Sequence, residues 1–201
     1  GAVLASASWP TFNPNQRKTL KDPATRVNNV IGRVYEPGST LKPVIMSIAM
    51  EQGLVRENEA FHCAGRVRIA DGVITDIKAH GSQVLPDLIV NSCNVGMAQI
   101  GIRFKPRFAY DNLRQWGFSS LSGIELPAEE VGLVSTPEQW RGVVPANIAI
   151  GQGIGMTPLQ LVTALSAVVN GGFCVRPYIV KEARDGQGKV VYCGKAFVKN
   201  V

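Results

Sequence analysis

The stretch Tyr35-Glu-Pro-Gly-Ser-Thr-Leu-Lys-Pro43 is the most informative part of this 201-residue sequence. Apolar residues recur with helical spacing from its end up to Gly53, which predicts a helix that is apolar over most of its circumference and is therefore buried. Pro43 falls in the first turn of this helix, where a missing N–H costs little, and Gly53 suits the position just after its end. The residues that define the apolar face are Leu41, Val44, Ile45, Ile48 and Ala49.

Ser39 and Lys42 are three residues apart at the start of this helix, so both side chains lie on one face. A serine hydroxyl is a poor nucleophile unless a base lies within hydrogen-bond reach. A lysine can be that base if burial lowers its pKa, and the predicted helix is buried. Chance alone gives an S-x-x-K spacing about half the time in a chain of this composition, so the spacing is weak evidence by itself. Its position at the start of a buried helix strengthens it.

A second polar element, Ser92-Cys93-Asn94, lies between two predicted helices, Pro86–Val90 and Val95–Ile102. A serine there can pass on a proton, and an asparagine amide can hold both a lysine and a substrate amide. Such an S-x-N turn alone is more often an ordinary helix cap. Downstream of S-x-x-K it becomes specific, because the two motifs together occur in penicillin-binding proteins and class A β-lactamases.

The sequence resembles the transpeptidase domain of class B penicillin-binding proteins, the peptidoglycan D,D-transpeptidases. The resemblance runs in order over about residues 1–180 and rests on five segments: Gly1–Asn15, Tyr35–Pro43, Asn91–Met97, Ile150–Gln160 and Asn170–Gly172. It implies an α+β fold that is the helix-rich part of the penicillin-binding protein and serine β-lactamase-like fold. Residues 1–201 would then form a partial transpeptidase domain, with most of the sheet missing from this chain.

The resemblance also implies a role for each residue of the two motifs. Ser39 would attack the penultimate D-Ala carbonyl of a peptidoglycan stem peptide, or a β-lactam ring, and form an acyl-enzyme. Lys42 would be the base, Ser92 would relay a proton, and Asn94 would position Lys42 and the substrate. No metal or organic cofactor is implied. The implied partners are stem peptides, β-lactam antibiotics, a membrane glycosyltransferase and other cell-wall synthesis proteins of division or elongation, at the outer face of the bacterial cytoplasmic membrane.

The third motif of this family, K-[ST]-G, does not occur in the 201 residues. Lys18-Thr19-Leu20 comes too early, and Gly194-Lys195-Ala196 lacks both the hydroxyl residue and the final glycine. The strand carrying this motif supplies an oxyanion N–H, and loss of one such donor costs a factor of roughly 10²–10³. We therefore expect an excerpt of a longer protein, without its membrane anchor, that is a weak or inactive catalyst alone and leaves an apolar helix face uncovered.

Two other functions remain compatible with the sequence. A non-catalytic fragment or pseudoenzyme could act as a scaffold in cell-wall synthesis, and the absent third motif favours it. A serine β-lactamase or β-lactam sensor shares the S-x-x-K chemistry, but the class D pattern usually has a β-branched residue where Asn94 stands.

Composition excludes several further classes of protein. The chain is 45% hydrophobic and 18% charged, which excludes a disordered, collagenous or coiled-coil chain. Its net charge of +6 suits a polyanionic or membrane-proximal setting, but no run of basic residues is interleaved with aromatics, so no nucleic-acid surface is predicted. The four cysteines have no C-x-x-C spacing and the two histidines are isolated, which argues against zinc.

The remaining segments predict a mixture of short elements. Residues 3–7 form a strand, 16–35 a surface loop or short helix, and 61–82 loops with short strands. Pro106–Trp116 is helical, and Thr136 and Thr157 each begin a helix with a Thr-Pro-x-Gln capping pattern. Residues 174–183 and 189–192 form a hairpin around Asp185-Gly-Gln-Gly188, which keeps Cys174 and Cys193 too far apart for a disulfide.

Overall fold

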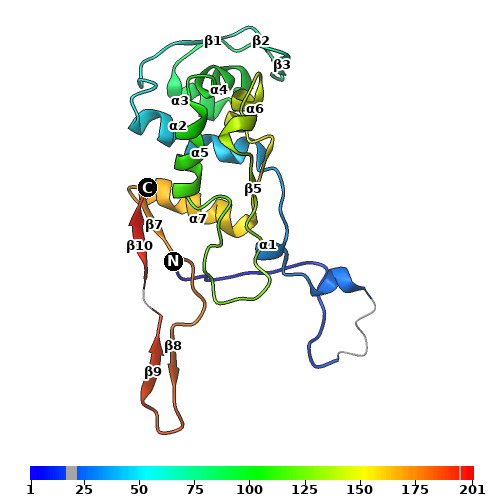
Figure 1. Cartoon of the computed structure of the whole chain (residues 1–201), viewed down its shortest axis with the longest axis vertical. Helices are drawn as coiled ribbons and strands as arrows, with labels where there is room; N and C mark the ends of the chain where they lie inside the picture. The colour runs from blue at the N-terminus through cyan, green and yellow to red at the C-terminus, as the bar shows by residue number, and fades with distance from the viewer. Residues whose placement is uncertain (17–21, 195) are drawn as a thin grey trace.

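The computed structural model describes residues 1–16, 22–194 and 196–201; the tripeptide Lys18–Leu20 and Lys195 lie outside this part. Figure 1 shows short strands at one end, helices in the middle and a projecting hairpin at the other end. The α-helices are α1 (Asn29–Gly32), α2 (Lys42–Glu51), α3 (Leu85–Val90), α4 (Asn94–Gly101), α5 (Pro106–Gln115), α6 (Val144–Ala149) and α7 (Pro158–Val169). This arrangement agrees with the predicted helix-rich α+β class.

All strands of the described residues are short and pair antiparallel in twos. β1 (Phe61–Cys63) pairs with β4 (Gly81–Gln83), and β2 (Arg66–Ile69) with β3 (Gly72–Thr75). β5 (Leu133–Val134) pairs with β6 (Ile154–Gly155). The remaining pairs are β7 (Phe173–Val175) with β10 (Val198–Asn200) and β8 (Glu182–Arg184) with β9 (Val190–Cys193).

The helix predicted from the S-x-x-K stretch is α2, and it is the centre of the core. A 3₁₀ turn, Gly38–Leu41, precedes it, Pro43 lies in its first turn, and Gly53 follows its C-cap with a φ of 63°. Its apolar residues are buried as predicted. α2 packs against α4 and α7, and α4 packs against α6, β1 and β3. The core therefore joins the helix carrying Ser39 and Lys42 to the helix that follows Ser92.

The two predicted capping patterns have different outcomes. Thr157 Oγ1 accepts a hydrogen bond from the Gln160 N–H at 3.2 Å, and Gln160 Oε1 accepts one from the Thr157 N–H at 2.9 Å. This capping box begins α7, as predicted. Thr136 begins only one 3₁₀ turn, Pro137–Gln139, because the backbone leaves the helical region at Trp140, which is buried.

Two strand predictions need correction. Residues 3–7 form no strand, because after the bridge between Ala2 and Tyr178 the described residues give this segment no further pairing. β8 and β9 form the predicted hairpin, but the predicted strand 174–183 is interrupted around Pro177, which lacks an N–H, and its first part, β7, pairs with β10. All four cysteines are free thiols in the structure.

Residues 22–35 confirm the predicted short helical segment, with a 3₁₀ turn at Pro23–Arg26 followed by α1. Ile31 of α1 is buried with Ile124 and Leu159 in a small second core. This contact fixes the segment that leads into Tyr35 and the S-x-x-K turn.

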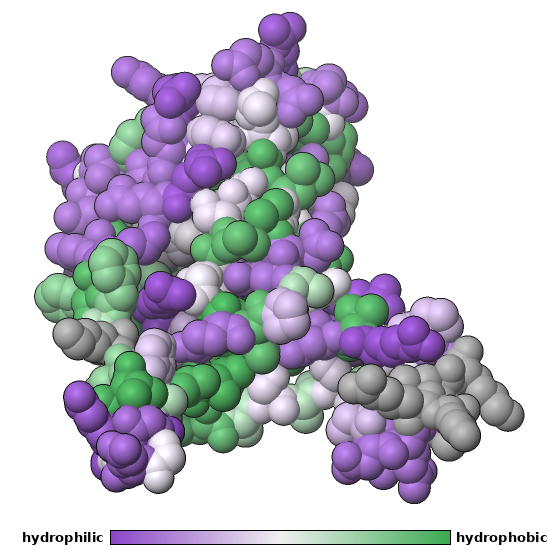
Figure 2. All heavy atoms as spheres, turned by 60° about the horizontal axis from the view of Figure 1, so that its bottom comes forward, coloured by the Kyte–Doolittle hydropathy of each residue, from purple (hydrophilic) through white to green (hydrophobic). Residues whose placement is uncertain are grey.

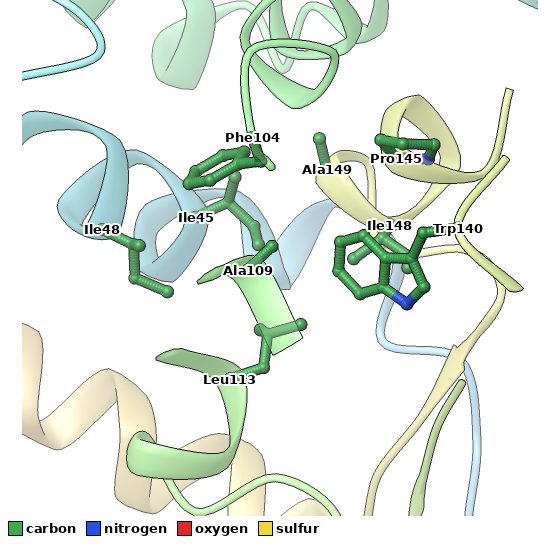
Figure 3. A pocket seen from close by; sticks show the side chains of 9 residues that line it. All are labelled: Ile45, Ile48, Phe104, Ala109, Leu113, Trp140, Pro145, Ile148 and Ala149. Atoms are coloured by element: carbon green, nitrogen blue, oxygen red, sulfur yellow. The ribbon is translucent and has the colours of Figure 1, made fainter. Parts of the chain in front are cut away.

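A small apolar cavity lies in the main core where α2, α5 and α6 meet (Figure 3). Ile45, Leu113 and Ile148 line it from these three helices, together with the ring of Trp140. Trp140 Nε1 is already used, since it donates to the Ser135 carbonyl at 2.9 Å. The cavity is therefore a packing defect of the core with no free polar group to orient a ligand.

Apolar side chains are exposed on the underside of the molecule, which Figure 2 brings forward. Val162 and Val169 of α7 are 54% and 87% exposed, and Leu4 of the first segment is 95% exposed. This confirms the expectation of an uncovered apolar helix face. Among the described residues, none of the helices combines the length and the apolar character needed to cross a bilayer.

Candidate active site

Ser39 lies in the 3₁₀ turn that leads into α2, and its side chain is exposed. The described residues give its Oγ no hydrogen-bond partner. The loop after α6 contacts this turn, because Gly38, with a φ of 57°, donates its N–H to the Gly151 carbonyl at 2.9 Å. A Cβ at Gly151 would overlap the Gly38 carbonyl. The glycine-rich loop after α6 is thus a structural turn, and it fixes the position of Ser39.

Lys42, one turn after Ser39, is only 1% exposed. Its Nζ donates three hydrogen bonds, to the Ser92 carbonyl at 2.6 Å, to Ser92 Oγ at 3.1 Å and to Asn94 Oδ1 at 2.7 Å. Burial lowers the pKa of Lys42, and the nearby Asp76 and Cys93 oppose this shift only in part. A buried amine whose pKa is lowered by desolvation is a candidate general base.

Ser92 joins α3 to α4 with a φ of 50°, a left-handed conformation that costs a residue with a Cβ about 1 kcal/mol or more. Its N–H donates to the Ile89 carbonyl at 3.1 Å, which ends α3 and reverses the chain. In this conformation both the carbonyl and the hydroxyl of Ser92 accept from Lys42. The strained turn is the feature that presents two acceptors to one buried ammonium.

Asn94 is the first residue of α4 and is half-buried. Its Oδ1 accepts from Lys42, and its Nδ2 donates to the Thr75 carbonyl at 3.0 Å at the end of β3. Because both ends of the amide are used, its orientation is fixed. The structure thus brings Lys42 into contact with Ser92 and Asn94, which lie 50 and 52 residues later in the sequence. Ser39 is exposed one helical turn before Lys42.

Cys93, between Ser92 and Asn94, is fully buried. Burial and a hydrogen bond with Asp76 raise the pKa of its thiol to about 12. Its sulfur accepts from the Gly96 N–H at 3.3 Å and so caps α4. It is a packed thiol rather than a reactive one.

Sequence reasoning missed the neighbours of Cys93. Cys63, Asp76 and His80 lie around it, so His80 is not isolated, and four potential metal ligands meet although their spacing in the sequence does not indicate it. The burial of Asp76 opposes ionisation, but hydrogen bonds from Cys93 and Val95 outweigh it and lower the pKa of Asp76. The only sequence pattern shared by these residues is the i, i+4 spacing of Asp76 and His80.

Comparison with known proteins shows which family the chain resembles. Residues 1–200 match the penicillin-binding protein transpeptidase domain family. The chain is 35% identical over 192 residues to penicillin-binding protein PbpB of Mycobacterium tuberculosis, covering 92% of the chain and 28% of that protein. It is 32% identical over 188 residues to stage V sporulation protein D of Bacillus subtilis, covering 92% of the chain and 29% of that protein. The chain spans less than a third of the length of these relatives.

Solved structures agree with the sequence comparison. Penicillin-binding protein 3 of Mycobacterium tuberculosis in complex with aztreonam superposes with a TM-score of 0.78 at 32% identity, over 85% of this chain and 39% of that one. A putative peptidoglycan glycosyltransferase of Atopobium parvulum gives a TM-score of 0.81 at 26% identity, over 97% of this chain and 44% of that one. With the S-x-x-K and S-x-N residues joined through a buried lysine, these matches show that the chain belongs to the transpeptidase family of class B penicillin-binding proteins.

Proposed function

We propose that this chain carries the acylation centre of a peptidoglycan D,D-transpeptidase that β-lactams also acylate. The observation that carries the proposal is the buried Lys42, which contacts Ser92 and Asn94 and lies one turn after the exposed Ser39. The names of several relatives support the reaction class; the Escherichia coli relative, 30% identical over 172 residues, is named peptidoglycan D,D-transpeptidase FtsI.

The proposed reaction begins when neutral Lys42 takes the proton of Ser39 Oγ, directly or through Ser92 Oγ. Ser39 Oγ then forms a bond with the carbonyl carbon of the penultimate D-Ala, or of a β-lactam ring. When the C–N bond breaks, the proton returns to the leaving nitrogen. As a neutral amine, Lys42 has two N–H donors for the Ser92 carbonyl and Asn94 Oδ1, and a lone pair for the Ser92 hydroxyl. The hydrogen bonds of the structure fit both protonation states.

The second half-reaction forms the cross-link. An amine of a neighbouring stem peptide attacks the acyl carbon and gives a proton to Lys42, and the bond to Ser39 Oγ breaks as that proton passes to the oxygen. The backbone N–H of Ser39, at the start of a helix, would donate one hydrogen bond to the oxyanion. The proposed site of action is the outer face of the cytoplasmic membrane, with a membrane glycosyltransferase and other cell-wall synthesis proteins as partners.

A scaffold role without catalysis is the second candidate, and the observation that favours it is the absence of a K-[ST]-G tripeptide from the sequence. Such a chain would keep the fold and the S-x-N turn, and would not form an acyl-enzyme.

Intact-mass spectrometry after incubation with penicillin tests the proposal. We expect a persistent adduct of one penicillin on the parent chain and none on Ser39→Ala. Since Ser39 is exposed, its truncation leaves the fold in place. Ser47→Ala is the matched control, because Ser47 lies on α2 and donates only to the Pro43 carbonyl, so it should keep the adduct.

Three other results would contradict the proposal. No adduct on a folded parent chain would favour the scaffold role. An adduct that is hydrolysed within seconds, with turnover of penicillin, would indicate a β-lactamase. An adduct that survives in Ser39→Ala would show that Ser39 is not the nucleophile.

A further inference from the structure

Four metal-ligating side chains converge behind the S-x-N turn from four separate segments. Cys63 ends β1, Asp76 follows β3, His80 precedes β4 and Cys93 precedes α4. One ligand atom of each, counting sulfur, ring nitrogen and carboxylate oxygen, lies within 4.8 Å of all the others. The two cysteines are fully buried, and the side chains of Asp76 and His80 are 3% and 8% exposed.

Three of these atoms are spaced like one face of a metal tetrahedron, and Cys93 Sγ lies within 4.8 Å of all three. Cys63 Sγ lies 3.6 Å from Asp76 Oδ2 and 3.7 Å from His80 Nδ1, and His80 Nδ1 lies 3.7 Å from Asp76 Oδ2. Zinc bonds of about 2.0–2.3 Å at tetrahedral angles give edges of about 3.3–3.8 Å between ligand atoms. A hydrogen-bonded histidine and carboxylate would instead approach to roughly 2.7–3.2 Å.

The surroundings also suit a buried cation. Asp76 accepts from the Val95 N–H at 3.3 Å and from Cys63 Sγ at 3.6 Å, and its ion-pair partner within 4 Å among the described residues is His80 rather than a Lys or Arg. Against the effect of burial, these hydrogen bonds lower the pKa of Asp76, so the group at this position is a buried carboxylate, and carboxylates are zinc ligands. The buried Nε2 of Gln83 lies beside the Cys93 sulfur, and a metal-bound thiolate would accept a hydrogen bond from it.

We propose that Cys63, Asp76, His80 and Cys93 bind one zinc ion. Two sulfurs, one imidazole nitrogen and one carboxylate oxygen form a closed ligand set of the structural type, which suits zinc better than Mg²⁺ or Ca²⁺. On binding, both thiols lose their protons to solvent and His80 coordinates through Nδ1 as the neutral ring. The Lys78 carbonyl, 3.9 Å from Cys63 Sγ, stays outside the ligand set.

The site would act as a clamp between two parts of the fold. Cys63, Asp76 and His80 come from the β1–β4 region, whereas Cys93 stands between Ser92 and Asn94. Asn94 is also tied to Thr75 at the end of β3, one residue before Asp76. The ion would therefore fix the turn that presents Ser92 and Asn94 to Lys42, and this consequence, unlike zinc binding itself, rests on the proposed function.

Cobalt substitution tests the site directly. The reduced 201-residue chain, freed of metal by a chelator, is titrated with Co²⁺ and then with Zn²⁺. We expect one cobalt per chain, with a thiolate charge-transfer band and the intense visible bands of tetrahedral coordination, and both are lost when zinc displaces cobalt. Cys63→Ser and His80→Ala should weaken binding at least tenfold, whereas Cys174→Ser and Cys193→Ser, matched controls outside the cluster, should bind like the parent.

Three results would overturn the zinc site. The first is no stoichiometric cobalt binding by the folded, reduced chain, and the second is equal cobalt binding by Cys63→Ser and the parent. The third is a Cys63–Cys93 disulfide in protein purified with zinc.

Penicillin acylation is measured in parallel. We expect the chain without metal to be acylated at least several-fold more slowly than the parent, and zinc to restore the rate. Cobalt binding without any acylation would reject the proposed function and leave the zinc site standing.

Discussion

Replacing Asn94 by alanine removes the side chain that joins Lys42 to the end of β3. The change deletes a hydrogen bond of 2.7 Å from Lys42 Nζ and one of 3.0 Å to the Thr75 carbonyl. With Lys42 as the neutral amine, each of the two is worth about 0.5–1.5 kcal/mol. Because Asn94 is half-buried, water replaces part of this, and we expect a loss of about 2 kcal/mol in the free energy of unfolding.

Urea unfolding followed by circular dichroism measures this loss, and the acylation rate with a fluorescent penicillin measures the effect on chemistry. Lys42 would keep Ser92 as its remaining partner, so we expect acylation to slow by tenfold or more. The reasoning is refuted if Asn94→Ala unfolds within about 0.5 kcal/mol of the parent and acylates at the parent rate, since Lys42 would then not depend on this contact.

Asn94→Asp separates the effect on stability from the effect on chemistry. A carboxylate at this position still accepts from Lys42, so the loss of stability should be smaller than for alanine. Its negative charge favours the ammonium form and raises the pKa of Lys42, which leaves less neutral base at pH 7. We therefore expect slow acylation that recovers as the pH rises; a rate that does not change with pH would exclude Lys42 as the base.

Three further predictions concern the core cavity, the turn that carries Ser39 and the exposure of two cysteines. Ile148→Ala enlarges the core cavity and should cost about 2–5 kcal/mol in unfolding free energy by urea denaturation. A loss below about 1 kcal/mol would contradict the burial of Ile148 in the core. Gly151→Ala should both destabilise the chain and slow acylation, because the new Cβ overlaps the turn that carries Ser39. Gly153→Ala is the control, since Gly153 also has a positive φ but has open space around it. This control should lower the free energy of unfolding by only about 1 kcal/mol and keep the parent acylation rate. Iodoacetamide at neutral pH should label the exposed Cys193 in the native chain and spare Cys174, because burial raises the pKa of the Cys174 thiol. Peptide mass spectrometry measures the labelling. Labelling of Cys174 but not of Cys193 would contradict the burial of the first and the exposure of the second.

The local parts of the fold followed from the sequence because their causes lie within a few residues. The apolar periodicity after Leu41, the proline in the first turn and the glycine at the end define α2 completely. The Thr157–Gln160 capping box likewise begins α7 by contacts three residues apart. The same pattern at Thr136 gave one turn only, because packing of Trp140 in the core ended the helix there.

The strands were harder to predict because pairing depends on a distant partner. The segment after Ala2 is extended but has no neighbouring strand among the described residues, so extended character alone did not make a strand. β7 pairs with β10, which lies more than 20 residues later, and nothing in the local pattern of residues 173–175 specifies that partner.

The sequence by itself determined the family, the helix-rich fold and the one-turn spacing of Ser39 and Lys42. Only the tertiary structure decided that Lys42 is buried and that the S-x-N turn, 50 residues later, surrounds its amine. It also decided that Cys63, Asp76, His80 and Cys93 meet behind that turn. The physical reason is that hydrophobic periodicity and capping act within one or two turns of chain, whereas these clusters form only when α2 packs on α4 and β1 pairs with β4.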